Sequence, residues 1–214
     1  MSAGQSPQRP QRPDWTIDQG WADYTAEEHA VWKTLFERQS ALLPGRACDA
    51  FVDGMQKLPI GAEQIPDFRA LSAVLMQTTG WQVVAVPGLV PDDVFFDHLA
   101  HRRFPAGHFI RKPHELDYLE EPDVFHDVFG HVPMLMNPVM ADYIQAYGQG
   151  GLRAKALGVL DKLARVSGTP SNLGWCSRPT ASVSSVRASR RRSPKRCLRW
   201  TTRHPTASAL TWSG

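Results

Sequence analysis

The sequence lacks the features that mark membrane, secreted and disulfide-rich proteins. The 214-residue chain has no apolar run of roughly 18 residues, the length that a membrane-spanning helix needs. Its three cysteines give neither a disulfide framework nor a zinc-ligand spacing. Its first residues contain no apolar segment typical of a secretory signal. We therefore expect a cytoplasmic protein in a reducing compartment, with no membrane partner.

Acidic residues are absent from the last part of the chain. Residues 166–214 contain nine Lys and Arg and ten Ser but no Asp or Glu. The overall net charge of +3 therefore conceals a net charge of −6 in residues 1–165. Because the basic charge belongs to the tail alone, it is no argument that the whole protein binds nucleic acid.

Hydrophobic periodicity is present up to about residue 165 and predicts mostly helices. Thr25 and Glu28 have the spacing of a capping box, and Asp67 is a candidate N-cap for a helix that ends before Gly80. The fold class we expect is mainly α, or α+β with a few short strands. The expected helices cover 25–43, 47–57, 67–79, 91–102, 122–130, 138–148 and 151–165, and the expected strands cover 81–86 and 108–111.

Three segments follow from this pattern. Residues 1–13 are expected to be a disordered polar leader, and residues 14–165 form the domain. Residues 166–214 have no hydrophobic periodicity and are expected to be a disordered basic tail.

Two histidines five residues apart form the most specific chemical pattern. His126 and His131 can reach one metal ion only if the second lies where a helix ends or is distorted, because residues five apart are rotated by about 140° in a regular helix. Gly130 permits such a distortion. By themselves two histidines fit zinc, copper or iron, although the HExxH spacing of zinc proteases is absent. The other six histidines are expected to be surface or structural residues.

The wider sequence around this pair resembles a known family. The segments are Arg102-Arg-Phe-Pro-Ala-Gly-His-Phe-Ile-Arg111 and Glu121-Pro-Asp-Val-Phe-His126-Asp-Val-Phe-Gly-His131. Both resemble the pterin-dependent aromatic amino acid hydroxylases, and within that family the short bacterial enzymes that act on phenylalanine. The resemblance covers about residues 14 to 165 and implies an incomplete hydroxylase catalytic domain.

That resemblance implies a mononuclear Fe(2+) site, a tetrahydrobiopterin-type cofactor, and L-phenylalanine and O2 as small-molecule substrates. His126 and His131 would bind the iron, with a carboxylate as the third ligand. Arg111 would pair with the substrate carboxylate. The remaining implied roles are pterin binding by Phe95 and Val90, a substrate pocket lined by Tyr118 and Leu119, and support around the iron from Pro122, Asp127 and Glu121.

The resemblance fails at the third ligand. The family has a glutamate about 45 residues beyond the first histidine, in a Trp-Tyr-Thr-Val-Glu-Phe-Gly-type segment, whereas Asn172 occupies that place here. Codons for that family segment, read one base later, give the sequence of residues 167–175. We therefore interpret residues 166–214 as an out-of-frame translation of the family's last third, and we expect the chain as written to be inactive.

Three alternatives remain open at this stage. The protein could be a tryptophan or tyrosine hydroxylase relative, a non-catalytic remnant of the phenylalanine enzyme, or a nucleic-acid-binding protein that uses the basic run at 190–196. The last has no aromatic residues suited to base stacking, so we expect no evolved nucleic-acid partner. No coiled-coil heptads occur, and we expect a monomer.

Overall fold

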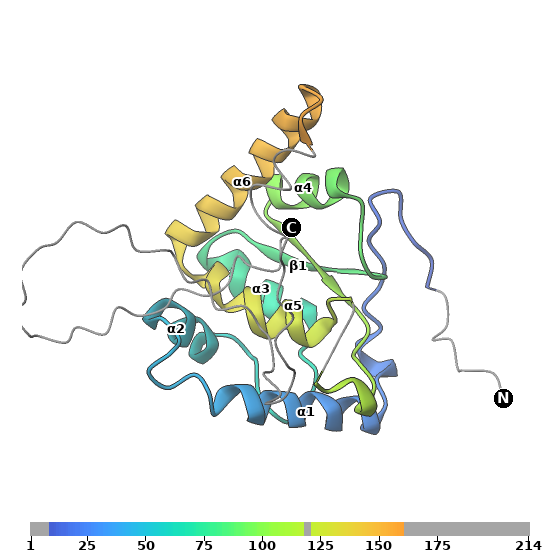
Figure 1. Ribbon diagram of the computed structural model, residues 1–214, viewed down its shortest axis with the longest axis vertical. Coiled ribbons are helices and arrows are strands. Elements are labelled where there is room, and N and C mark those ends of the chain that lie inside the picture. The colour runs from blue at the N-terminus through green and yellow to red at the C-terminus, as the bar shows by residue number, and fades with distance from the viewer. Residues whose placement is uncertain (1–8, 118–120, 161–214) are drawn as a thin grey trace, which may run out of the picture.

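The computed structural model describes residues 9–117 and 121–160, and within these ranges it is mainly helical (Figure 1). Among the helices of these two ranges, none combines the length and hydropathy needed to cross a lipid bilayer. The α-helices are α1 (Ala26–Ser40), α2 (Asp49–Lys57), α3 (Phe68–Thr78), α4 (Asp92–Ala100), α5 (Val124–His131) and α6 (Pro138–Ala156). The strands are β1 (Gln82–Val86) and β2 (Arg103–Gly107), and short 3-10 helices cover η1 (Trp21–Asp23), η2 (Pro113–Glu115) and η3 (Val132–Met136).

Local capping signals fix where several helices begin. The capping box predicted at α1 is confirmed, since Thr25 accepts from the Glu28 N–H and the Glu28 carboxylate accepts from the Thr25 N–H. Asp67 caps α3 through the N–H of Arg69, as predicted. α4 ends at Ala100, earlier than the predicted Arg102, because Arg102 has a φ of 55°, which no right-handed helix can accommodate.

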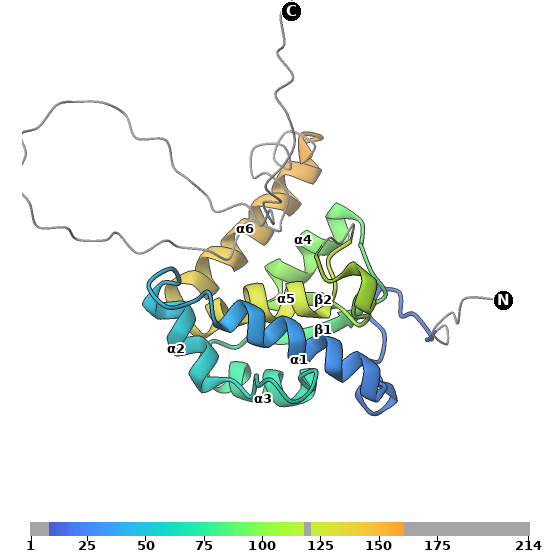
Figure 2. The same ribbon diagram turned by 60° about the horizontal axis from the view of Figure 1, so that its bottom comes forward.

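An aromatic cluster joins α1 to α5 at the centre of the molecule. The Trp32 ring lies 5.1 Å from Phe125, and the Phe36 ring lies 5.5 Å from Phe129. Phe125 and Phe129 stack on each other with their ring centroids 4.9 Å apart. Figure 2 shows α1 running across α5. The helix that carries both candidate metal ligands is therefore anchored in the core.

The two strands form a small parallel sheet in which Val84 pairs with Pro105. The prediction of a strand at 108–111 is wrong, because the strand is residues 103–107. Pro105 is tolerated there. The Gln82 N–H donates to Arg102 and the His108 N–H donates to Val86, so even-numbered residues of this segment face β1. The nitrogen of Pro105, which carries no hydrogen, faces away from β1, so no hydrogen bond of the sheet is lost.

One continuous helix replaces the two predicted at 138–148 and 151–165. Helix α6 continues through Gly148, Gly150 and Gly151, and the residues beyond 160 lie outside the described ranges. The glycines do not end the helix because two of them make close contact with α4. A Cβ on Gly148 would lie 2.4 Å from the Ala100 nitrogen, and one on Gly151 would lie 2.1 Å from the Phe96 ring. Figure 1 shows α4 and α6 side by side.

Candidate metal centre

Helix α5 presents the candidate ligands at its beginning and at its end. Asp123 caps the helix, because its Oδ1 accepts from the His126 N–H at 2.9 Å. The apolar residues of α5 are fully or almost fully buried: Val124, Phe125, Val128 and Phe129. The burial of these four side chains holds the helix in place and fixes the direction in which its polar side chains point.

The two histidine rings converge. His131 is the last residue of α5 and has φ −122° and ψ −42°, so the helix ends at the second histidine, as the sequence predicts. The ring centroids of His126 and His131 lie 5.0 Å apart. Since a metal–imidazole bond is about 2 Å long, rings at this separation can share one ion.

Asp127 orients the first histidine. Nδ1 of His126 lies 3.0 Å from Oδ1 of Asp127, and Oδ2 of Asp127 accepts from the Gly107 N–H at 2.8 Å. A carboxylate only accepts hydrogen bonds, so Nδ1 carries the proton. The lone pair of Nε2 is then free for a metal ion, the arrangement that metal-binding histidines usually have.

The second histidine is buried and uncharged. His131 is 7% exposed, and its ring lies 5.8 Å from the Phe104 ring on β2. Burial, together with the neighbouring His126 ring, lowers the pKa of His131 to about 3. His131 is therefore neutral at neutral pH, the form in which imidazole binds metals.

Arg111 is held by a carboxylate that the sequence analysis did not single out. Its Nε and Nη2 donate to the two oxygens of Asp123 at 2.8 and 3.0 Å. The Asp123 side chain is completely buried and also accepts from the Arg111 N–H. Asp123 thus fixes both the cation and the start of α5. Asp123 follows Pro122 directly and precedes the first helical residue, Val124, so its N-cap role has a local sequence signal. Its pairing with Arg111 has no such signal.

The other predicted site residues lie on three segments. Phe95 is half-buried on α4, with its ring 5.9 Å from Phe96, and Val90 is half-buried in the preceding loop. A Cβ on Gly88, in that same loop, would lie 3.6 Å from Oε2 of Glu121. The Pro122 carbonyl lies next to Gly107, where a Cβ would be 3.3 Å away. Tyr118 and Leu119 lie outside the described residues.

The described ranges hold two of the candidate metal ligands. Within residues 9–117 and 121–160, no group of three His, Cys, Asp or Glu side chains gathers around one point. Asn172, the residue at the predicted third position, lies outside these ranges. The paired rings, the protonated Nδ1 of His126 and the neutral His131 fit a metal ion.

Comparison with known proteins points to one family. A family model described as biopterin-dependent aromatic amino acid hydroxylase matches residues 18–181, which extends past the predicted boundary at 165/166. A phenylalanine-4-hydroxylase of Caulobacter vibrioides is 68% identical over 155 residues, which are 72% of this chain and 53% of that protein. The phenylalanine-4-hydroxylase of Chromobacterium violaceum is 61% identical over 153 residues, which are 72% of this chain and 52% of that protein.

Solved structures give the same result for the fold. The Chromobacterium violaceum phenylalanine hydroxylase with bound iron(III) and 7,8-dihydrobiopterin matches with a TM-score of 0.71 at 54% identity, over 78% of this chain and 64% of that one. The same enzyme with iron and phenylalanine matches with a TM-score of 0.67 at 54% identity, over 74% and 60%. The chain spans about half the length of the curated relatives it matches.

Proposed function

The chain belongs to the biopterin-dependent aromatic amino acid hydroxylase family, and on this premise we propose that it carries the iron-binding part of a phenylalanine 4-monooxygenase. The reaction is hydroxylation of L-phenylalanine to L-tyrosine with O2 and a tetrahydropterin. The observation that carries the proposal is the pair of imidazole rings 5.0 Å apart, with the first ring oriented by Asp127.

In this proposal His126 and His131 hold Fe(2+), and Asp127 keeps Nε2 of His126 directed at the ion. When bound, iron and tetrahydrobiopterin supply the activation of O2. The protein contributes position and exclusion of water. The buried ring of His131 and the Phe104 ring beside it form an apolar wall next to the metal.

Substrate orientation is assigned to Arg111. Its guanidinium has five N–H donors, and Asp123 accepts from Nε and Nη2, so further donors remain for a carboxylate. A cation held in one geometry by a buried partner orients the substrate with little loss of entropy on binding. We assign the pterin to Phe95 and Val90, and the aromatic pocket to Tyr118 and Leu119, on the family resemblance. Pro122 and Glu121 support the loop beside the metal.

The 214-residue chain itself is proposed to be inactive. Asn172 stands where the family has a glutamate, and a neutral amide binds hard cations less well than a carboxylate does. The out-of-frame interpretation of residues 166–214 explains the substitution and predicts that the in-frame protein is active. The expectations of a cytoplasmic location and a monomeric state stay predictions.

Among the alternatives, phenylalanine is favoured as the substrate because the relatives at 61–68% identity are named phenylalanine-4-hydroxylases. The alternative of a non-catalytic remnant differs only in whether this chain still hydroxylates phenylalanine.

A comparison of two proteins tests the proposal. The 214-residue chain and a chain with the reading frame restored after Arg165 are assayed for tyrosine with Fe(2+), tetrahydrobiopterin, O2 and phenylalanine. We expect tyrosine from the restored chain and none above background from the 214-residue chain. Equal rates would contradict the proposal that the 214-residue chain is inactive. A restored chain that hydroxylates only tryptophan or tyrosine would contradict phenylalanine as the substrate.

A further inference from the structure

An extended segment near the N-terminus closes the outer edge of the sheet. We call residues 12–20 the N-terminal strap. The Ile17 N–H donates to the Ala85 carbonyl of β1 at 2.9 Å, in an isolated antiparallel bridge. Gln19 fastens the far end, because its side chain donates to the Pro66 carbonyl at 2.9 Å and accepts from the Phe68 N–H at 2.8 Å. In Figure 1 the strap is the dark-blue segment beside the sheet.

The near end of the strap is fastened to α4 by a buried histidine. Nε2 of His98 lies 2.8 Å from the Asp14 carbonyl oxygen, and the His98 side chain is 0% exposed. A carbonyl only accepts, so Nε2 carries the proton. Nδ1 of His98 is then an unprotonated nitrogen, and it is buried without a hydrogen-bond partner. The docked strap therefore favours the neutral ring.

Protonation of His98 is costly while the strap is docked. A proton on Nδ1 would place a donor and a positive charge where no acceptor lies. Three charged groups face the ring: the Asp14 carboxylate from the strap, Arg103 from β2 and Asp97 from α4 itself. Arg103 bridges both carboxylates, at 3.2 Å to Asp14 and 3.1 Å to Asp97, so it offsets one of their two negative charges. Burial of the ring remains the largest influence on its pKa, and it acts against protonation.

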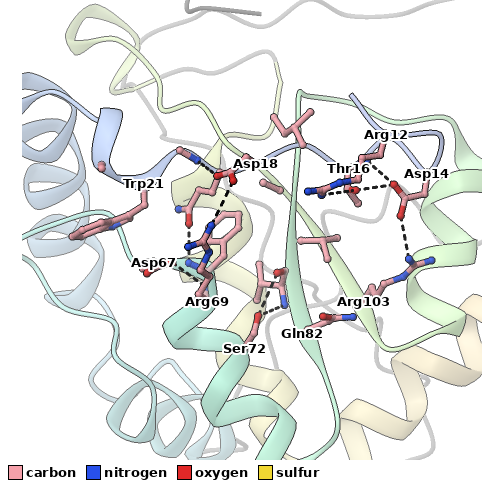
Figure 3. A pocket seen from close by; sticks show the side chains of 18 residues that line it. Arg12, Asp14, Thr16, Asp18, Trp21, Asp67, Arg69, Ser72, Gln82 and Arg103 are labelled. Carbon is pink, nitrogen blue, oxygen red and sulfur yellow. Dashed lines mark hydrogen bonds and ion pairs between the residues drawn. The ribbon is translucent and has the colours of Figure 1, made fainter. Parts of the chain in front are cut away.

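The strap is held at a few points rather than along its length. A hollow of about 620 Å³ lies between the strap, the start of α3 and β1. Figure 3 shows Asp14, Thr16 and Arg103 at one end of this hollow and Asp18 and Arg69 at the other. Trp15, next to Asp14, has a φ of 66°, a left-handed conformation that a bulky residue adopts only when its surroundings force it.

We propose that the N-terminal strap is an acid-released latch: protonation of His98 at Nδ1 detaches the strap from α4 and from β1. Release leaves the Ala85 carbonyl without its strand partner and opens one side of the sheet. Val83 stays covered, because its N–H donates to the Ser72 hydroxyl at 2.9 Å. The latch does not depend on metal or pterin binding, so it stands apart from the proposed function.

The direction of the pH dependence follows from the docked and open states. Burial is the main cause that lowers the pKa of His98 from its usual value of 6.5 when the strap is docked. The open state therefore binds the proton more tightly than the docked state. The docking equilibrium constant therefore has its full value well above pH 6.5 and falls as the pH drops below that, by at most about tenfold per pH unit, until the docked pKa is reached.

Amide hydrogen exchange of the full chain tests the latch. The probe is the Ile17 N–H, followed by mass spectrometry at pH 7.5, 6.5 and 5.5 after correction for intrinsic exchange rates. We expect its protection to fall between the two lower pH values, by at most about sixfold, because half of the open state is already protonated at pH 6.5. In His98→Gln the amide nitrogen still donates to Asp14 but takes up no proton, so protection should be independent of pH. His101 lies three residues after His98 and is exposed, so His101→Gln is the matched control. It should keep the wild-type dependence of Ile17 protection on pH.

Two results would overturn the latch: protection in the wild type that does not change with pH, or His98→Gln with the wild-type pH profile. A second measurement needs no variant. The imidazole signal of His98 in an NMR titration should have its midpoint below 6.5, and a midpoint above 6.5 contradicts the proposal even if His98→Gln does not fold.

Discussion

Asp127 joins the sheet to the first candidate ligand, since one oxygen accepts from Gly107 and the other from His126. Asp127→Asn leaves only one acceptor oxygen for these two donors. We expect the affinity for Co2+ to fall by roughly 10–100-fold, which is typical when the partner of a ligating histidine is removed. The affinity is measured by titrating the protein with Co2+ and following visible absorption. Glu63→Gln, an exposed carboxylate paired with Lys33, should leave the affinity unchanged.

Asp123 is the buried partner of Arg111. Asp123→Asn keeps an N-cap but removes the charge that balances the guanidinium, whose side chain is only 13% exposed. We expect the free energy of unfolding to fall by roughly 3–5 kcal/mol, because an unpaired charge is left in a buried position. Denaturant unfolding measures the change.

Asp67→Asn is the matched control for Asp123→Asn. It alters another helix N-cap, where Asn and Asp are about equally good. It should change stability by no more than a few tenths of a kcal/mol. Similar losses for the two variants would mean that the Arg111 pair contributes nothing beyond capping.

At the level of elements, the packing of α6 on α4 depends on one close approach of backbone. Gly148→Ala would place a Cβ 2.4 Å from the Ala100 nitrogen, and backbone cannot move aside cheaply. We expect destabilisation by roughly 1–3 kcal/mol in thermal or denaturant unfolding. Gly150→Ala in the same helix meets nothing within 4 Å and should instead stabilise by up to about 1 kcal/mol. Stabilisation by both variants would contradict the described helix pair.

The same helices show what sequence reasoning reaches at this scale. The starts of α1 and α3 were predictable because Thr25, Glu28 and Asp67 act on their own neighbours. The continuity of α6 was not, because the glycines that suggest a break are required by contacts with α4. The position of β2 was missed for a similar reason. Proline usually breaks a strand, and only the fold shows that the Pro105 nitrogen faces away from β1.

At the scale of the whole molecule, the candidate site divides in the same way. The convergence of His126 and His131 follows from one short segment with a glycine before the second ring. The pairing of Arg111 with Asp123 and of Gly107 with Asp127 joins residues 12 and 20 positions apart, which only the fold brings together. The roles proposed for Phe95, Val90, Tyr118 and Leu119 rest on family resemblance and stay predictions.

The proposed function requires that His126 and His131 hold one metal ion between them. The direct measurement is a titration of the purified 214-residue chain with Co2+, in parallel with His126→Gln, His131→Gln and, as a control outside the pair, His108→Gln. We expect one ion per chain, bound at least about tenfold more weakly when either ring of the pair is replaced, and unchanged affinity in the control. Wild-type affinity in either His126→Gln or His131→Gln would contradict it.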